Sequence, residues 1–270
     1  MNKAPQRRRT SAPPSGLRDR RPTLWHIPVS HYSEKVRWAL AHKGIEHRRL
    51  APPPGAHMAI ALALTRGAHK TVPVLRLDGR NIGDSSAIIA ALEQHWPQPS
   101  LYPDDPVERR RALELEEYFD EQLGPQIRLL VWHELRTDPE RMAVLAGTML
   151  PGSLGESATA RSAAGRFASG FSQLRFRVAD PADAEAARRG VVAALDRLEA
   201  ELASGEGEFL VGDSFSVADI AAASLFYPLV TPPESPAVVD PPASLERFRA
   251  PLRERPGYRW VAETYAAQRN

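Results

Sequence analysis

The feature that most constrains the fold is the proline-rich segment "PQPSLYPDDP", residues 97–106, which contains four prolines. Before it, short strand-like apolar runs alternate with helical patterns, whereas after it the apolar residues follow helical spacing only. Such a change indicates a boundary between a unit built on a β-sheet and an all-helical unit. We therefore predict a domain over residues 22–97, a linker over 98–106 and a second domain over 107–270.

The first unit has an element order that leaves few topologies open. The sequence predicts strands over residues 23–27, 45–50, 72–77 and 81–82, and helices over 33–43, 57–66 and 84–96. Asp78-Gly79 is a hairpin signal between the last two strands. The order β-α-β-α-β-β-α predicts a four-stranded mixed sheet with helices packed against it.

The second unit is predicted to be all α-helical. One helix covers residues 107–123 and ends at Gly124-Pro125, its continuation over 127–136 follows after a kink or a break, and a further helix covers 182–203. Ser216 and Asp219 have the spacing of a capping box, and the Ala-rich helix after them is apolar nearly all round, which predicts burial. Residues 151–170 are rich in Gly, Ser and Ala and are expected to be the least structured part.

Composition restricts the chemistry. The 270 residues contain no cysteine, so a disulfide, a thiolate metal site and a catalytic protein thiol are excluded. Any sulfur chemistry must therefore use a thiol that arrives as a substrate. No apolar run approaches the ~20 residues of a membrane-spanning helix. We expect a soluble protein of a reducing compartment, the cytoplasm, without membrane association.

Charge is unevenly distributed along the chain. The formal net charge is +2, but residues 1–21 carry about +6 and the remainder about −4. This basic tail lacks apolar residues and is predicted to be disordered. It is compatible with a solvated start, a transit peptide or a nucleic-acid contact.

Several catalytic motifs are missing from the sequence. The segment His133-Glu134-Leu135-Arg136-Thr137 lacks the second histidine of HExxH, and neither a P-loop nor a complete dinucleotide fingerprint is present. The histidines do not fall at metal-ligand spacing, so no metal site is predicted. Hydrolase, metalloenzyme and nucleotide-dependent functions therefore lack support.

Four segments together resemble the cytosolic glutathione transferase superfamily. They are "SHYSEKVRWALAHKGI", "TVPVL", "GDSSAI" and "FLVGDSFSVADI", and the resemblance runs from about Thr23 to Ala267. It implies a thioredoxin-like first domain, an all-helical second domain and a homodimer. It also implies glutathione as the co-substrate, without a further cofactor.

Two serines flank the predicted start of the first helix, and from the residues alone either can be an N-cap. Resemblance to the serine-type members implies that Ser30 bonds the sulfur of the thiol. A hydroxyl donor and the positive end of a helix both favour a thiolate over a thiol. Ser33 is predicted to be the N-cap, and Ser33 and Tyr32 are secondary site candidates.

The resemblance also places thiol-peptide contacts at a proline turn. Val72-Pro73 matches a turn in which a cis proline presents the backbone of the preceding residue to the thiol peptide. An edge-strand proline is the alternative reading. His69 and Lys70, just before this strand, would meet the glycyl carboxylate, although a solvated loop explains them as well.

A further implied contact lies at the start of the third helix. Asp84-Ser85 matches the acidic residue and serine that hold the γ-glutamyl end of glutathione. A carboxylate suits the ammonium group, and a helix N-terminus suits the carboxylate. Asp84 is equally compatible with a plain N-cap.

These features predict a glutathione transferase that directs the thiol at a small hydrophobic electrophile, as in detoxification, with peroxidase activity as a variant. The alternative is a noncatalytic protein of the same fold that binds a thiol peptide or a hydrophobic ligand. A role with nucleic acid depends on the basic tail alone. Residues 137–180 are expected to shape the electrophile pocket, with Tyr118, Trp132 and Phe226 as candidate lining residues.

Overall fold

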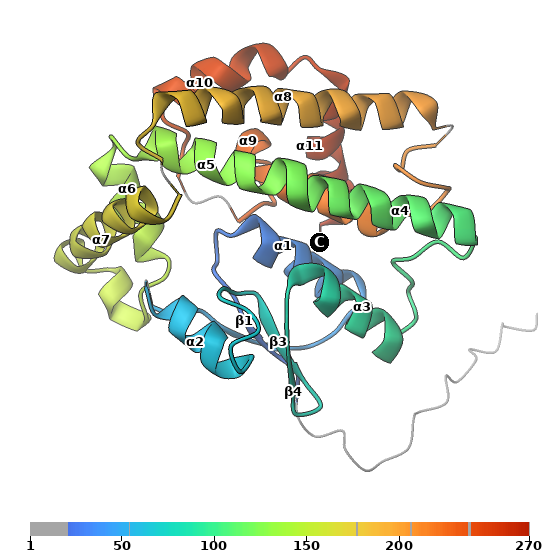
Figure 1. Ribbon diagram of the computed structural model, residues 1–270, viewed down its shortest axis with the longest axis horizontal. Helices are drawn as coiled ribbons and strands as arrows, with labels where there is room; N and C mark the ends of the chain where they lie inside the picture. Colours follow the sequence, from blue (N-terminus) through green and yellow to red (C-terminus); the bar gives the residue numbers. More distant parts are fainter. Residues whose placement is uncertain (1–20, 54, 177, 206, 237–238, 270) are drawn as a thin grey trace, which may run out of the picture.

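The computed structural model describes residues 21–53, 55–176, 178–205, 207–236 and 239–269. The sheet lies in the lower half of Figure 1 with α1 (His31–His42) and α3 (Ser85–His95), most of the later helices form the upper half, and the helical segments of residues 139–176 lie at the left. The predicted disordered tail falls outside the described residues except for Arg21, whose exposed guanidinium pairs with Glu46 at 3.2 Å.

Four short strands form one mixed sheet in the order β2-β1-β3-β4. Strand β1 pairs in parallel with β2 and antiparallel with β3, and β3 pairs antiparallel with β4. The strands are β1 Thr23–Trp25, β2 Arg48–Leu50, β3 Val74–Leu77 and β4 Arg80–Gly83. The predicted element order and mixed sheet are therefore confirmed. Strand β1 ends before Ile27, because the Ile27 amide donates to Ser33 Oγ at 3.2 Å rather than to a neighbouring strand.

Alternating side chains of the strands face opposite layers, as period-2 geometry requires. Leu24 and Leu75 belong to the large core that α1 and α3 share with the helical half. Val74 and the half-buried Trp25 pack on the other face, in a small cluster with Ala61 of α2. The sheet is therefore covered on both faces. The layer formed by α1 and α3 lies between the sheet and the helical half.

Helices account for most of the remaining chain. Those beside the sheet are α1 His31–His42, α2 Ala56–Leu64 and α3 Ser85–His95. The helical half consists of α4 Pro106–Tyr118, the π-helix η1 Phe119–Leu123, α5 Gly124–Leu135, α6 Pro139–Gly147, the 3-10 turn η2 Gly152–Gly155, α7 Ala158–Phe176, α8 Pro181–Ser204, α9 Val217–Val230, α10 Ala243–Arg249, the 3-10 turn η3 Ala250–Leu252 and α11 Pro256–Gln268. The predicted fold class, a thioredoxin-like unit followed by an all-α unit, is confirmed; the division at residues 98–106 stays a prediction.

The predicted stop at Gly124-Pro125 is wrong. The π-helical turn η1 joins α4 directly to α5, and Gly124 and Pro125 are the first residues of α5. A proline is tolerated at the start of a helical segment, because its missing N–H and fixed φ cost least there. In Figure 1, α4 and α5 run as one diagonal rod across the molecule.

The Gly/Ser/Ala-rich segment is also more regular than predicted. Most of it forms the long helix α7, which packs closely on α6. A Cβ at Gly165 would lie 2.9 Å from the Ala143 Cα, so small residues here permit the close approach of the two helices. The Gly-, Ser- and Ala-rich composition, which is typical of loops, here reflects the close packing of α6 and α7.

The capping box at the start of α9 is confirmed. Asp219 accepts from the Ser216 amide at 2.8 Å, and its other oxygen accepts from the Leu210 amide at 2.8 Å. The helix is buried almost throughout, as its uniformly apolar sequence predicts. It packs against α1, α4, α5 and α11 and forms the centre of the helical half.

A buried ion cluster joins the two halves. Lys35 of α1 is fully buried, and its Nζ lies 2.5 Å from Asp120 Oδ2, 2.8 Å from Glu116 Oε1 and 3.0 Å from Ser86 Oγ. Burial alone would lower the pKa of Lys35, but the carboxylates of Asp120 and Glu116 outweigh it, so the pKa is raised. The cluster therefore clamps α1 and α3 to α4 and η1.

Replacing Lys35 with methionine tests this clamp. Lys35→Met leaves two buried carboxylates without their cation, which should cost about 3–5 kcal/mol of unfolding free energy. Arg21→Met, at an exposed ion pair, should change it by less than about 0.5 kcal/mol. Urea denaturation followed by circular dichroism measures both.

A triple variant separates charge from packing. Adding Glu116→Gln and Asp120→Asn to Lys35→Met removes the uncompensated charges, so much of the lost stability should return. If the triple variant is no more stable than Lys35→Met, the loss arises from packing and the clamp is not electrostatic.

Candidate functional site

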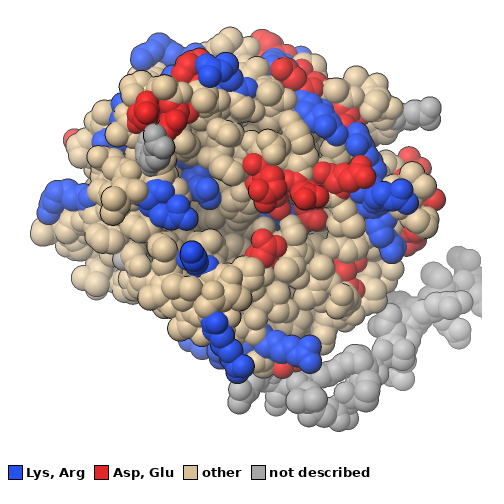
Figure 2. All heavy atoms as spheres, viewed as in Figure 1, with Lys and Arg blue, Asp and Glu red and all other residues tan. Residues whose placement is uncertain are grey.

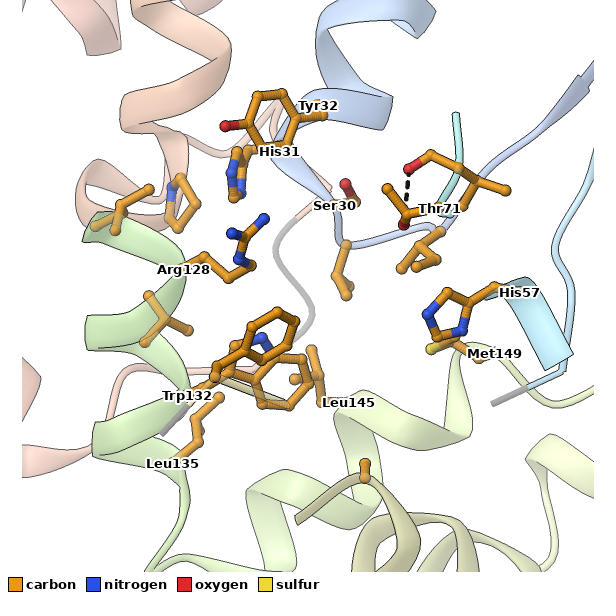
Figure 3. A pocket seen from close by; sticks show the side chains of 18 of the residues that line it. Ser30, His31, Tyr32, His57, Thr71, Arg128, Trp132, Leu135, Leu145 and Met149 are labelled. Carbon is orange, nitrogen blue, oxygen red and sulfur yellow. Dashed lines mark hydrogen bonds between the residues drawn. The ribbon is translucent and has the colours of Figure 1, made fainter. Parts of the chain in front are cut away.

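One cavity of about 410 Å³ lies between the sheet half and the helical half. It opens at the C-terminal end of β1, where the chain turns into α1, and α5, α6 and α7 face it from the other side (Figure 3). Of the predicted site residues, the following line it: Ser30, Tyr32, His69, Lys70, Val72, Pro73, Asp84 and Ser85. Ser33 does not.

Ser30 directly precedes the first residue of α1 and lines the cavity. Its Oγ accepts from the Ser33 amide at 3.3 Å, so Ser30 is the N-cap of α1. Among the residues that the structure describes, no acceptor takes the proton of this hydroxyl. One lone pair is therefore used in capping while the O–H remains available to a group in the cavity.

The prediction that Ser33 is the N-cap is wrong. Ser33 is fully buried in the first turn of α1, where its Oγ accepts from the Ile27 amide. It satisfies a backbone group at the end of β1 that would otherwise lack a partner. The two serines therefore have distinct roles, but the cap and the cavity-facing hydroxyl both belong to Ser30.

Val72 and Pro73 line the cavity on the side of the sheet half, and the bond between them is cis, as predicted. The Thr71 hydroxyl donates to the Val72 carbonyl at 3.4 Å (Figure 3). The ring of His69 packs on Gly83, where an added Cβ would lie 2.5 Å from it. His69 is thereby held beside β4, while Lys70 is exposed at the rim of the cavity.

Asp84 combines a cap with a free acceptor. Its Oδ1 accepts from the amides of Ser86 and Ala87, both at 3.0 Å, so it is the N-cap of α3. Its φ is +71°, a backbone conformation uncommon outside glycine and better tolerated by Asp and Asn than by other residues. The other carboxylate oxygen makes no hydrogen bond to the described residues. Ser85 beside it is buried at the cavity wall.

Tyr32 acts as a structural link. Its hydroxyl donates to the Asp120 carbonyl at 2.6 Å, and burial raises the pKa of the phenol. A Cβ at Gly124 would lie 2.1 Å from the Tyr32 oxygen, so glycine is required for this approach. The link fixes the first turn of α1 against the π-helix.

The opposite wall is apolar and comes from the helical half. The main contributors are Val131, Trp132, Leu135, Leu145, Met149, Phe167, Phe171, Phe176 and Val239. Residues from α6 and α7 are among them, which agrees with the predicted role of residues 137–180. Trp132 lines the cavity as predicted; Phe226 is instead buried in the core, and the half-buried Tyr118 stacks against Arg197 outside the cavity.

His31 and Arg128 also line the cavity, and sequence reasoning predicted neither as a site residue. The His31 ring is buried, and its Nε2 makes no hydrogen bond to the described residues. Burial, together with the positive charge of Arg128, lowers the pKa of His31 to about 3, so the imidazole is neutral at physiological pH. Neither residue forms a recognisable motif; their proximity depends on how α5 crosses α1.

The described residues contain no group of three or more His, Asp or Glu side chains that could hold a metal ion. No helix among them is both long enough and apolar enough to cross a bilayer.

A thioredoxin-like sheet unit whose cis-proline turn faces an all-helical unit across one cavity is the glutathione transferase fold. Comparison with known sequences agrees. The model of the glutathione S-transferase N-terminal domain matches residues 24–100, and that of the C-terminal domain matches residues 181–263. The chain belongs to the glutathione S-transferase superfamily.

Its relatives are distant. A probable glutathione S-transferase of Oryza sativa subsp. japonica is 30% identical over 143 residues, 49% of this chain and 58% of the relative. The maleylacetoacetate isomerase of Rattus norvegicus is 38% identical over 93 residues, 33% of this chain and 43% of the relative. The chain therefore spans about half the length of the curated relatives it matches.

Solved structures share the fold at low identity. The β-etherase of Sphingobium sp. strain SYK-6 aligns with a TM-score of 0.58 at 19% identity, covering 90% of this chain and 99% of that one. A theta class glutathione S-transferase from Xanthomonas axonopodis pv. citri, solved with glutathione bound, aligns with a TM-score of 0.55 at 22% identity, covering 90% and 97%.

The buried neutral His31 predicts a pH-dependent stability. Unfolding restores an ordinary histidine pKa of about 6.5, so the unfolded chain takes up a proton below that pH while the native imidazole stays neutral down to about 3. The stability is therefore full above pH 6.5 and falls as the pH drops toward 3. By pH 5 the loss from His31 should be about 2 kcal/mol.

His31→Gln removes this titration. Between pH 7.5 and 5, the unfolding free energy of the unmodified protein should fall by about 2 kcal/mol more than that of the variant, measured by urea denaturation at each pH. Parallel pH curves for the two proteins would contradict the assignment.

Proposed function

We propose that this protein is a glutathione transferase that activates the thiol of glutathione at Ser30 and directs it at a small hydrophobic electrophile. The observation that carries the proposal is the division of one cavity into two chemically distinct walls. Polar groups of the sheet half line one wall, and apolar side chains of the helical half line the other. A polar thiol peptide and an apolar second substrate can therefore meet in one space.

Ser30 is suited to stabilise a thiolate. Its O–H points into the cavity without an acceptor among the described residues, and it lies at the N-terminus of the twelve-residue helix α1. A hydrogen bond from this hydroxyl and the partial positive charge of the helix both favour the anionic form of sulfur. The pKa of a bound thiol should therefore fall below the ~8.5 of a free thiol.

The polar wall can hold the rest of glutathione. Val72, before the cis bond, lines the cavity, so its backbone can pair with an extended thiol peptide, and the free oxygen of Asp84 suits the γ-glutamyl ammonium. Ser85, at the N-terminus of α3, suits the α-carboxylate. His69 and Lys70 supply groups for the glycyl carboxylate at the rim.

The reaction is a substitution or an addition at carbon. In a substitution, the thiolate sulfur forms a bond to the electrophilic carbon, the leaving group departs with its electron pair, and the thiol proton passes to solvent. In an addition, the sulfur bonds to one carbon of an activated double bond, the π electrons move to the neighbouring atom, and that atom takes a proton from solvent. Assembly as a homodimer and a cytoplasmic location are part of the proposal, in keeping with the superfamily. Peroxidase activity would use the same thiolate with a hydroperoxide: the sulfur bonds to the terminal oxygen, the O–O bond breaks to release an alcohol and leave a sulfenic acid, and a second glutathione then forms the disulfide and releases water.

Ser30→Gly tests the activating hydroxyl, because glycine caps a helix nearly as well as serine. With glutathione and 1-chloro-2,4-dinitrobenzene, kcat/KM should fall about 100-fold, as for the loss of one transition-state donor. The apparent pKa in the pH–rate profile should rise. Ser30→Thr keeps a hydroxyl and should retain most activity.

Ser33→Ala is the matched control for the neighbouring hydroxyl. It removes a buried hydrogen bond to Ile27 and should cost about 1 kcal/mol of stability with little change in the pH–rate profile. Equal kinetic losses in Ser30→Gly and Ser33→Ala would overturn the assignment. Retention on immobilised glutathione without turnover would instead favour a noncatalytic binding protein.

Asp84→Asn tests the ammonium contact. Asparagine keeps an Oδ1 acceptor for the α3 cap and tolerates positive φ, but removes the charge. The KM for glutathione should rise about tenfold or more with kcat nearly unchanged.

Asp105→Asn is a matched control for this test. Asp105 caps α4 in the same way, accepting from the amides of Val107 and Glu108 at 2.8 and 3.0 Å, and does not line the cavity. Its substitution should leave the KM for glutathione unchanged. If both variants alter KM equally, Asp84 acts only as a cap.

A further inference from the structure

Arg128 stands out against the apolar wall of the cavity. It projects from α5 into the cavity between His31 and Trp132 (Figure 3). The next residues of this wall along α5, Val131 and Leu135, are apolar. The side chain therefore places a guanidinium within a surface that is otherwise suited to a hydrophobic molecule.

This guanidinium has no carboxylate partner among the residues that the structure describes. Among the described residues it lies over the ring of Phe176, whose centroid is 4.9 Å from the guanidinium carbon. Burial lowers the pKa of Arg128, and the charge of Arg175 lowers it further. By contrast, the buried Arg37 and the half-buried Arg188 each pair with a buried glutamate.

The acidic residues of the cavity do not supply the missing partner. Asp120 is held by Lys35, and Asp84 caps α3 on the opposite wall. Glu121 is exposed, and no carboxylate contributes to the pKa shift of Arg128. His31 is neutral, so Arg128 is the cation that α5 contributes to the described cavity lining. Figure 2 shows acidic side chains gathered on one side of the central hollow and basic side chains on the other.

We propose that Arg128 binds a carboxylate of the second substrate, so that the preferred electrophile is an apolar molecule carrying one carboxylate. This inference rests on the proposed transferase function and specifies the class of its electrophile. A guanidinium binds a carboxylate through two parallel hydrogen bonds, which orient as well as attract it. A single cation on an apolar wall matches a single anionic group on an apolar body.

The position of Arg128 would let its contact with the carboxylate orient the electrophile toward the sulfur. It reaches from α5 toward the same space that the Ser30 hydroxyl faces. A carboxylate held there fixes one end of the electrophile, while the aromatic side chains of α5 and α7 hold its body. The reacting carbon is thereby kept near the sulfur, which is the entropic advantage of a bound pair.

A matched pair of electrophiles tests the proposal. 4-Chloro-3,5-dinitrobenzoate and its methyl ester undergo the same substitution: the thiolate sulfur bonds to the ring carbon, and chloride leaves with the bonding pair. With Arg128→Gln, the ratio of kcat/KM for the acid to that for the ester should fall about 10- to 100-fold. Arg128→Lys keeps the charge and should retain part of the ratio.

Arg175→Gln is the control for a general change of charge. Arg175 contacts the same Phe176 ring at 5.3 Å, but it is exposed and does not line the cavity. Its substitution should leave the acid-to-ester ratio unchanged. An unchanged ratio in Arg128→Gln would overturn the proposal. Equal losses for both electrophiles with a raised thiol pKa would also overturn it, because Arg128 would then act on the thiolate.

Direct binding separates this proposal from the proposed function. The unreactive acid 3,5-dinitrobenzoate should bind the unmodified protein, and Arg128→Gln should weaken that binding about tenfold or more in calorimetry. If neither electrophile turns over but this difference is found, the transferase function fails and the anion site stands. If both turn over and the acid binds Arg128→Gln equally well, the anion site fails and the function stands.

Discussion

The buried ammonium of Lys35 holds the sheet half against the helical half. It lies on α1, the helix that carries Ser30, and its carboxylate partners belong to α4 and the π-helix. Because a buried charge without a partner is costly, this cluster admits few alternative placements of the two halves. The cavity is formed between those halves, so the cluster also fixes the distance across which its walls face each other.

The π-helix carries this constraint to the site. It places Asp120 so that the side chain meets Lys35 while the carbonyl accepts from Tyr32, and it starts α5 at Gly124, where the Tyr32 ring needs space. A single π-helical turn often marks a functional position, because it rotates the following helix. Here the following helix is the one that carries Arg128 and Trp132 into the cavity.

Sequence reasoning recovered the fold and one wall of the site. The strand and helix order, the capping box at Ser216 and the cis bond before Pro73 follow from local patterns or from the family resemblance. The N-cap was assigned to Ser33 instead of Ser30, because the position of the cap depends on where β1 ends. His31 and Arg128 were not predicted for a different reason. They lie on helices far apart in the sequence, and the local spacing of apolar residues does not show that these helices come together. The prediction that residues 151–170 are the least structured part failed because small residues are common both in loops and in closely packed helix pairs.

The hydroxyl of Ser30 has a consequence for the durability of the protein. In the proposed reaction a thiol and an electrophile meet at Ser30, and a cysteine in the same place would itself be open to alkylation or oxidation. A serine hydroxyl is far less reactive toward both, and the 270 residues contain no thiol. Under the proposed function, the protein would therefore handle reactive compounds without presenting them with a thiol of its own.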